Sequence, residues 1–298
     1  MKKTYFNLYL FIDMMYNKDN TFEKSILFFR QRNLKYGGTV LSIIITVSNQ
    51  KGGVGKTTTS AALASGIFLT GRKVLGIDLD PQGNLGFCLG AGADSRYTIL
   101  DVLKGDIPVE EALVRGDGSC DLLVSDITLS SSGLERLPGK RECILRDAIA
   151  PVIDQYDYII IDTPPALNLL TVNAYSTSDY LIIPMSSDIL SLVGLAQLKE
   201  TIESVRSTLN PDFRVLGILL TRYNRRTRLA HDVLDMANQL AVQIDTQVFE
   251  TKIRSGVAIA EAPAHGESIF TYNPNSLAVQ DYAEFLLEIA PAIHLKEA

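Results

Sequence analysis

The chain has 298 residues, of which 46% are apolar and 21% charged, and its formal net charge is −6. This composition is ordinary for a soluble globular protein, and the length suits one large α/β domain or two small ones. No apolar run approaches the roughly 20 residues needed to cross a bilayer, which argues against a membrane-spanning protein.

The charge is unevenly distributed along the chain. Residues 1–38 carry seven Lys/Arg and three Asp/Glu, so this stretch is +4 and the remainder is −10. A second basic group lies inside the acidic remainder, and it consists of Arg222, Arg225, Arg226 and Arg228. Since a local basic patch can bind a phosphate backbone, the acidic total argues only mildly against nucleic-acid binding.

The first forty residues fit no common targeting pattern. They open with lysines and a short apolar run, but Asn7 interrupts that run, Asp13 closes it and no small-x-small cleavage site follows. We interpret residues 1–40 as an N-terminal extension, either a flexible or loosely helical arm or an over-extended gene start with the true start near Val40. Residues 41–298 are predicted to form a single domain.

From residue 42 onward, short β-branched runs alternate with helix-like stretches. The predicted strands are residues 42–48, 73–80, 121–126, 157–164, 179–185, 214–223 and 247–253, and helical segments include 57–70 and 191–208. Because the runs are apolar throughout, they are typical of parallel strands covered on both faces. The predicted fold class is therefore α/β, with a doubly wound, mostly parallel sheet and helices on both faces.

The last predicted helix, residues 276–293, is amphipathic. It carries Asp281, Glu284 and Glu288 but no basic residue. A helix lying on a membrane surface usually carries Lys or Arg on its polar face. Packing against the sheet is the better interpretation.

A glycine-rich loop, SNQKGGVGKTTTS at residues 48–60, joins a predicted strand to a predicted helix. It ends like the phosphate-binding pattern G-x-x-x-x-G-K-[ST], but Gln50 replaces the first glycine and a second lysine, Lys51, follows it. Backbone N–H groups and the helix N-terminus can surround phosphate oxygens here, Lys56 can reach the β- and γ-phosphates, and Thr57 can ligate Mg²⁺. The predicted nucleotide-binding residues are Gly52, Gly53, Val54, Gly55, Lys56, Thr57 and Thr58.

Two later strands end in acidic residues. GIDLDPQGN (76–84) places Asp78 and Asp80 two apart, so on an extended chain they share one face. A carboxylate there can orient an attacking water or hold the hydration shell of a metal. YIIIDTPPA (158–166) ends in Asp162, which we expect to face Mg²⁺ through a coordinated water, since Mg²⁺ gives up its waters reluctantly.

These motifs, KGGVGKTT, DLDPQGN and IIIDTPPA, resemble in order and spacing the ParA branch of the deviant-Walker P-loop ATPases, which also includes MinD-type proteins. The resemblance covers roughly residues 42–290. It extends to GILLTRYNRRTRL (217–229) and FETKIRSGVAIAEAPAHGESI (249–269), which are more particular to ParA/Soj partition proteins. It implies an ATPase that uses ATP and Mg²⁺.

The resemblance also implies roles for single residues. Two subunits are expected to enclose ATP, with Lys51 of each reaching the other's nucleotide like an arginine finger supplied in trans. Lys56 is then the phosphate lysine and, like Lys51, part of the catalytic set. Asp80 positions the attacking water and Asp78 supports the same site. Asn224 falls where the family often places an adenine contact.

Partners follow from the same resemblance. The ATP-bound homodimer is expected to bind DNA without sequence preference, and a ParB-like centromere-binding protein to stimulate slow hydrolysis, in the cytoplasm at the nucleoid. Arg226 matches a DNA-contacting position, whereas Ala258 stands where some members have arginine. The candidate DNA-binding residues are Arg222, Arg225, Arg226, Arg228, Lys252 and Arg254.

Other functions of this fold remain as alternatives to partition of a plasmid, mobile element or chromosome. A MinD-like or cargo-positioning ATPase would act at a membrane or another surface rather than on DNA, and the acidic terminal helix disfavours the membrane. An iron–sulfur reductase needs cluster cysteines, but Cys88, Cys120 and Cys143 are widely spaced and better fit a reducing cytoplasm. A bacterial tyrosine kinase would carry a C-terminal tyrosine cluster, which is absent from the sequence. DNA binding without catalysis would leave Asp80 without a role.

Overall fold

The computed structural model describes residues 42–91, 95–136 and 139–295. The interpretation of residues 1–40 as an extension lies outside these described residues and stays a prediction. Within them, one sheet has six parallel strands in the order β3-β2-β4-β1-β5-β6. The strands are β1 Ile43–Val47, β2 Val74–Asp78, β3 Asp121–Leu123, β4 Tyr158–Asp162, β5 Tyr180–Ser186 and β6 Arg214–Thr221.

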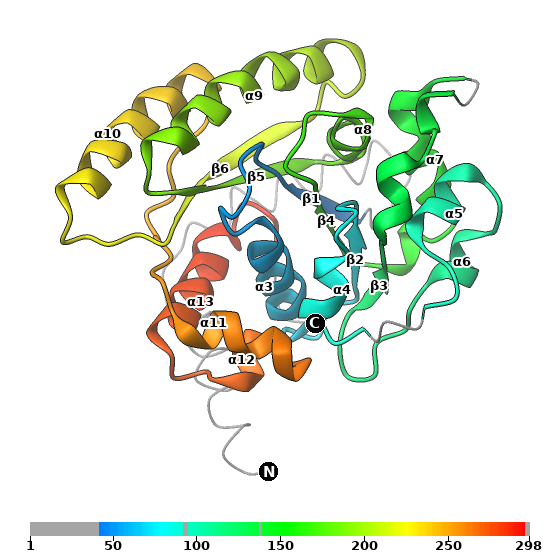
Figure 1. Ribbon diagram of the computed structural model, residues 1–298, viewed down its shortest axis with the longest axis horizontal. Coiled ribbons are helices and arrows are strands. Elements are labelled where there is room, and N and C mark those ends of the chain that lie inside the picture. The colour runs from blue at the N-terminus through cyan, green and yellow to red at the C-terminus, as the bar shows by residue number, and fades with distance from the viewer. Residues whose placement is uncertain (1–41, 92–94, 137–138, 296–298) are drawn as a thin grey trace.

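Helices cover both faces of this sheet (Figure 1). On one face lie α5 Ile99–Lys104, α6 Val109–Ala112, α7 Ile144–Ile149, α8 Leu169–Thr177, α9 Ile189–Thr208 and α10 Arg228–Gln243. On the other face lie α3 Lys56–Phe68, α4 Asn84–Cys88, α11 Val257–Glu261, α12 Ile269–Tyr272 and α13 Leu277–Ile289. The predicted doubly wound α/β class is confirmed.

Alternate residues of each central strand enter opposite cores. In β1, Ile44 packs in the core beneath α8 and α9, whereas Ile43 and Ile45 pack in the core beneath α3 and α13. In β4, Ile160 faces the α3 side and its neighbours face the other side. Because both faces are buried, most positions are apolar, which explains the continuous apolar runs in the sequence.

Helix α3 is the central helix of its layer. It is rich in small residues, and nearly every side chain from Thr59 to Ile67 is buried. Close packing explains one glycine, since a Cβ on Gly66 would lie 2.2 Å from Leu286 Cδ1 of α13. The terminal helix therefore packs within the fold, as predicted, and its Phe285 ring meets Phe249 edge to face at 4.9 Å.

The predicted seventh strand, residues 247–253, is wrong as a full strand. The segment runs beside β6 as an isolated parallel bridge between Val248 and Ile218, and further on Ile253 exchanges backbone hydrogen bonds with Leu220 and Tyr223, at 2.8 and 2.9 Å. The ladder is interrupted between these contacts, where the N–H groups of Glu250 and Thr251 donate to the Glu288 carboxylate of α13, at 2.6 and 2.8 Å. A side chain on a distant helix thus takes the donors that a strand would need.

No helix among the described residues is both long enough and apolar enough to span a bilayer.

The central strands should dominate stability. Ile45→Ala, in a fully buried position of β1, is expected to lower the free energy of unfolding by about 2–5 kcal/mol, because it removes buried methyl groups and leaves a cavity. Val242→Ala on α10, where 79% of the side chain is exposed, should change it by less than about 0.5 kcal/mol. Urea denaturation measures both, and equal effects would contradict the assigned core.

Candidate active site at the carboxyl edge

Parallel strands bring their ends to one side of the sheet, here called the carboxyl edge. The register pairs Asp162, the last residue of β4, with Val47 of β1 on one side and Asp78 of β2 on the other. The loop after β1 therefore emerges beside two aspartates that are far apart in the sequence. Open α/β sheets bind their ligands at this edge.

The phosphate loop has the backbone geometry that its glycines suggest. Gly53 and Gly55 have φ angles of 73° and 88°, in the left-handed region that favours glycine. An added Cβ at Gly52 or Gly53 would meet nothing within 4 Å, so the space around this turn is open. Gly55 caps α3 without any side-chain hydrogen bond, and the first turn holds no acidic residue. The free N–H groups of that turn suit an anion.

The two lysines of the loop occupy different surroundings. Lys56 is buried, and its Nζ donates to the carbonyl oxygen of Lys51 at 3.1 Å. Burial lowers the pKa of Lys56, while the charges of Asp162 and Asp80 oppose that shift. Lys51 instead turns away and forms an ion pair with Asp188, in the loop after β5. Lys51 and Lys56 therefore have different partners and do not duplicate each other's contacts.

The predicted magnesium residues lie together. Asp162 is fully buried and accepts hydrogen bonds from Thr57 Oγ1 at 2.7 Å and Ser60 Oγ at 2.8 Å. Burial raises the pKa of Asp162 to about 6, although both hydroxyl groups oppose the rise. An anionic carboxylate beside a hydroxyl is an oxygen donor set of the kind Mg²⁺ prefers. A cation there would also relieve the burial of negative charge, so these residues fit the metal.

Asp78 and Asp80 are both buried at the carboxyl edge. Strand β2 ends at Asp78, whose two oxygens accept the N–H groups of Asp80 and Leu85, each at 2.9 Å. Burial and the nearby Asp162 raise the pKa of Asp78 well above its usual value. Asp78 therefore shapes the turn that carries Asp80. Asp80 is itself buried, accepts the Gln82 N–H at 3.0 Å and lies close enough to Lys56 to influence its pKa.

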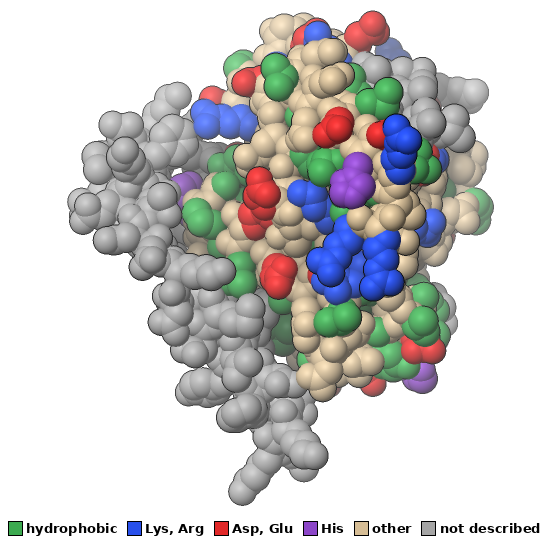
Figure 2. Space-filling model, turned by 90° about the vertical axis from the view of Figure 1, so that its left-hand side faces the viewer, with side chains coloured by type: hydrophobic (Ala, Val, Ile, Leu, Met, Phe, Trp, Pro, Cys, Tyr) green, Lys and Arg blue, Asp and Glu red, His purple; other side chains and the backbone are tan. Residues whose placement is uncertain are grey.

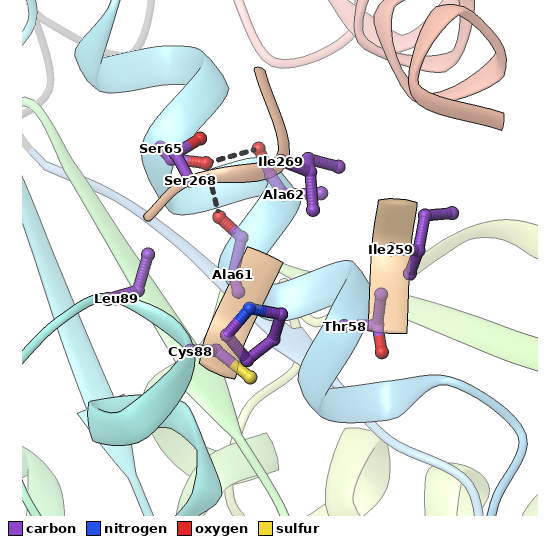
Figure 3. Close-up of a pocket in the computed structure, with 10 residues that line it drawn as sticks. Thr58, Ala61, Ala62, Ser65, Cys88, Leu89, Ile259, Ser268 and Ile269 are labelled. Atoms are coloured by element: carbon purple, nitrogen blue, oxygen red, sulfur yellow. Dashed lines mark hydrogen bonds between the residues drawn. The ribbon is translucent and has the colours of Figure 1, made fainter. Parts of the chain in front are cut away.

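Thr58 differs from the other loop residues. Its side chain lines a small cavity of about 20 Å³ between α3, α4 and the α11–α12 region, together with Cys88 and Ile259 (Figure 3). Any phosphate contact of Thr58 would therefore come from its main chain. Burial also raises the pKa of the Cys88 thiol to about 12. Among the described residues, no three His, Cys, Asp or Glu side chains are grouped as a metal cluster.

The basic loop, residues 222–228, leads from the end of β6 into the first residue of α10. Arg222, Arg225, Arg226 and Arg228 are all exposed. Figure 2 looks onto this side of the molecule and shows Lys and Arg side chains gathered in one patch. Asn224 Oδ1 accepts the Arg226 N–H at 3.1 Å, so the predicted adenine contact also shapes the loop.

One hydroxyl group connects the basic loop to the phosphate loop. Thr221, the last residue of β6, donates its Oγ1 to the Val54 carbonyl at 2.8 Å. The predicted base contact and the predicted phosphate contacts therefore belong to neighbouring loops.

Lys252 and Arg254 have internal partners instead. Lys252 Nζ donates to the carbonyl oxygens of Phe249 and Glu250, at 2.9 and 2.8 Å. The Arg254 guanidinium binds both oxygens of Asp281 on α13, at 2.7 and 2.6 Å, and this bond raises the pKa of Arg254. Asp281 is buried, so the pair fastens this segment to α13. The charged groups of Lys252 and Arg254 are therefore engaged in hydrogen bonds within the chain.

Sequence patterns did not reveal several site residues. Ser60 could have been suspected, because it lies one helical turn after Lys56 on the same face of α3. Its hydroxyl group donates to Asp162, as that of Thr57 does. Thr221 and Asp188 had no signal, since their contacts depend on tertiary structure. Two buried polar atoms in the loops after β1 and β5, Gln50 Nε2 and Ser187 Oγ, have no hydrogen-bond partner among the described residues. Such orphaned atoms are expected at a ligand site.

This edge defines a nucleotide-binding α/β domain of the P-loop class, and comparisons with known proteins agree. A family model described as an AAA domain matches residues 42–215. The chromosome partitioning protein ParA of Myxococcus xanthus is 38% identical over 255 residues, covering 83% of this chain and 87% of that protein. The sporulation initiation inhibitor protein Soj of Bacillus subtilis is 38% identical over 250 residues, covering 83% and 98%.

Two solved structures share the fold. Cobyrinic acid a,c-diamide synthase from Mycobacterium smegmatis, with bound ADP and magnesium, is 33% identical with a TM-score of 0.70, covering 82% of this chain and 92% of that chain. The septum site-determining protein MinD of Pyrococcus horikoshii, complexed with Mg-ADP, is 25% identical with a TM-score of 0.67, covering 85% and 99%. The chain belongs to the ParA/Soj family of P-loop ATPases, within the wider ParA/MinD group.

The buried charge of Asp162 should make stability depend on pH. Its carboxyl titrates near 6 when folded and near 4 when unfolded, so its protonated form favours the folded state and this contribution is lost as pH rises from about 4 to 6. In protein without nucleotide or metal, Asp162→Asn should therefore become progressively more stable than wild type over that window.

Urea denaturation across the pH range measures this difference. Asp232→Asn, on the exposed surface of α10, is the control and should track wild type. A constant difference for Asp162→Asn between about pH 4 and 7 would contradict the assigned titration.

Proposed function

We propose that this protein is a DNA-partition ATPase: ATP drives it into a homodimer that binds DNA without sequence preference, and hydrolysis releases the dimer. The observation that carries the proposal is the second lysine, Lys51, which precedes the glycines of a phosphate loop whose Thr57 is hydrogen-bonded to Asp162. Similarity to ParA and Soj over 83% of the chain supports the same function.

ATP is the substrate, and water is the second reactant. Lys56 and the N–H groups of the phosphate loop would bind the β- and γ-phosphates, with Thr57 and Asp162 holding Mg²⁺. The metal offsets the charge of the phosphate oxygens. Asp80 would orient the attacking water, and the bond between the γ-phosphorus and its bridging oxygen would break to give ADP and phosphate. Asp78 positions Asp80 through their 2.9 Å hydrogen bond.

The homodimer is what the resemblance to ParA-type ATPases implies, and the charge of the site agrees with it. Lys51 of each subunit would reach across to the nucleotide of the other and add a cation to the triphosphate. The nucleotide is then part of the interface, so cleavage of the γ-phosphate weakens it. This gives a switch whose dimeric state reports the bound nucleotide.

DNA and a partner protein complete the proposal. The basic loop offers Arg222, Arg225, Arg226 and Arg228 to the phosphate backbone. A dimer doubles this charge, which explains how ATP would control DNA binding. A ParB-like centromere-binding protein would stimulate hydrolysis, and the dimer would associate with the nucleoid. The cargo would be a plasmid, a mobile element or a chromosome.

A MinD-like function at a membrane is the second candidate, because the fold also resembles MinD. Its terminal helix would need a free apolar face. In α13 the apolar side chains Tyr282, Phe285 and Leu286 are buried within the fold. Co-sedimentation with anionic liposomes in the presence of ATP tests this function, and we expect none.

Asp80→Ala should separate binding from hydrolysis. Without the carboxylate that orients water, the variant should bind ATP and dimerise yet hydrolyse it at least about 100-fold more slowly. Size-exclusion chromatography with ATP and a phosphate-release assay measure both. Lys56→Ala is the matched control and should bind no nucleotide. An Asp80→Ala variant with wild-type turnover would refute the assigned role.

Arg226→Ala should weaken DNA binding equally for all sequences. One lost phosphate contact per subunit should also reduce the slope of log affinity against log salt by about 1 for each contact. Arg254→Ala should instead lower the free energy of unfolding, because it leaves the buried Asp281 carboxylate unpaired. Filter binding across a salt series, with ATP present, distinguishes the two variants. Weaker DNA binding for Arg254→Ala together with wild-type DNA binding for Arg226→Ala would contradict the assigned roles of these two residues.

A further inference from the structure

The Lys51 side chain has a partner within its own chain. Its Nζ forms an ion pair with Asp188, although β1 and β5 precede these residues and 137 positions separate them in the sequence. The strands are neighbours in the sheet, so both loops leave the carboxyl edge side by side. The pair is partly exposed, with 28% of the lysine side chain and 38% of the aspartate side chain accessible.

Both ends of this pair are held in place. The Lys51 N–H donates to Asn49 Oδ1 at 3.0 Å, and Asn49 Nδ2 donates to the Pro184 carbonyl of β5 at 2.8 Å. On the other side, Ser186 Oγ donates to the second carboxylate oxygen of Asp188 at 2.6 Å. The ion pair therefore joins two positioned groups rather than two freely moving side chains.

We propose that Asp188 is a cis latch, which keeps Lys51 within its own subunit until a nucleotide-loaded partner competes for the ammonium group. This inference rests on the proposed function, in which Lys51 acts on the partner's nucleotide. The ammonium group cannot stay against its own carboxylate and also reach across an interface. Each dimer must therefore open two latches.

The latch sets a threshold for assembly. A triphosphate carries more negative charge than one carboxylate, so a loaded partner can outcompete Asp188, whereas an ADP-bound partner offers less charge. Opening the latch costs part of the energy gained in trans. The latch would thus disfavour dimers that lack a γ-phosphate.

Asp188→Asn should make dimerisation easier. An exposed ion pair typically shifts an equilibrium by about 1.5- to 5-fold. With two latches per dimer, the midpoint of dimer formation with AMPPNP and Mg²⁺ should fall to about 2- to 25-fold lower protein concentration. Asp188→Glu keeps the charge and should stay near the wild-type midpoint. Analytical ultracentrifugation over a concentration series gives the midpoints.

Two controls make the result specific. Glu203→Gln removes the same charge from another exposed pair, with Lys199 on α9, and should leave the midpoint unchanged. Thermal melting of each variant checks that it folds. An Asp188→Asn midpoint equal to or higher than that of wild type, in a folded protein, would overturn the latch.

A different result would refute the proposed function. If the wild type forms no dimer with AMPPNP at any concentration, both the partition mechanism and the latch are refuted. If the wild type dimerises and Lys51→Ala does not, the trans lysine stands, and the Asp188→Asn midpoint alone decides the latch.

Discussion

The structure depends on one electrostatic constraint: three aspartates, Asp78, Asp80 and Asp162, are buried where two adjacent strands end. The charges of Asp162 and Asp80 act on the buried ammonium group of Lys56, and Asp78 is buried beside Asp162. Burial raises the pKa of Asp78 well above its usual value and raises the pKa of Asp162 to about 6. Hydroxyl and N–H donors from neighbouring loops compensate in part. The remaining negative charge fits a site that binds a metal together with a triphosphate.

Much of this arrangement could be predicted from the sequence because it follows from local patterns. Apolar runs ending in acidic residues locate both the parallel strands and the carboxyl edge, and they place Thr57 near Asp162. Contacts between residues that are far apart in the sequence could not be predicted. Glu288 interrupts the expected seventh strand, and Asp281 forms hydrogen bonds with the guanidinium group of Arg254. Neither α13 residue has any signature in the segment it affects.

The nucleotide and the DNA are proposed to meet on adjacent loops. Thr221 bonds to the phosphate loop, and the next residue, Arg222, adopts a left-handed φ of 50°, unusual for a residue with a side chain. Such a conformation persists only where surrounding contacts fix it. Tyr223 supplies one, since its N–H donates to the Ile253 carbonyl at 2.9 Å. The backbone at the start of the basic loop is therefore held in place on both sides of Arg222.

Both outer strands of the sheet are covered by short stretches of their own chain. Val248 bridges β6, and Val114 bridges the opposite strand, β3, in antiparallel fashion. A Cβ on Gly217 would lie 2.4 Å from the Phe249 ring, so this ring packs directly against the backbone of β6. Exposed strand borders invite uncontrolled fibre-like polymerisation. Each bridge occupies part of its border, so strand addition there would first have to displace a segment of the chain itself.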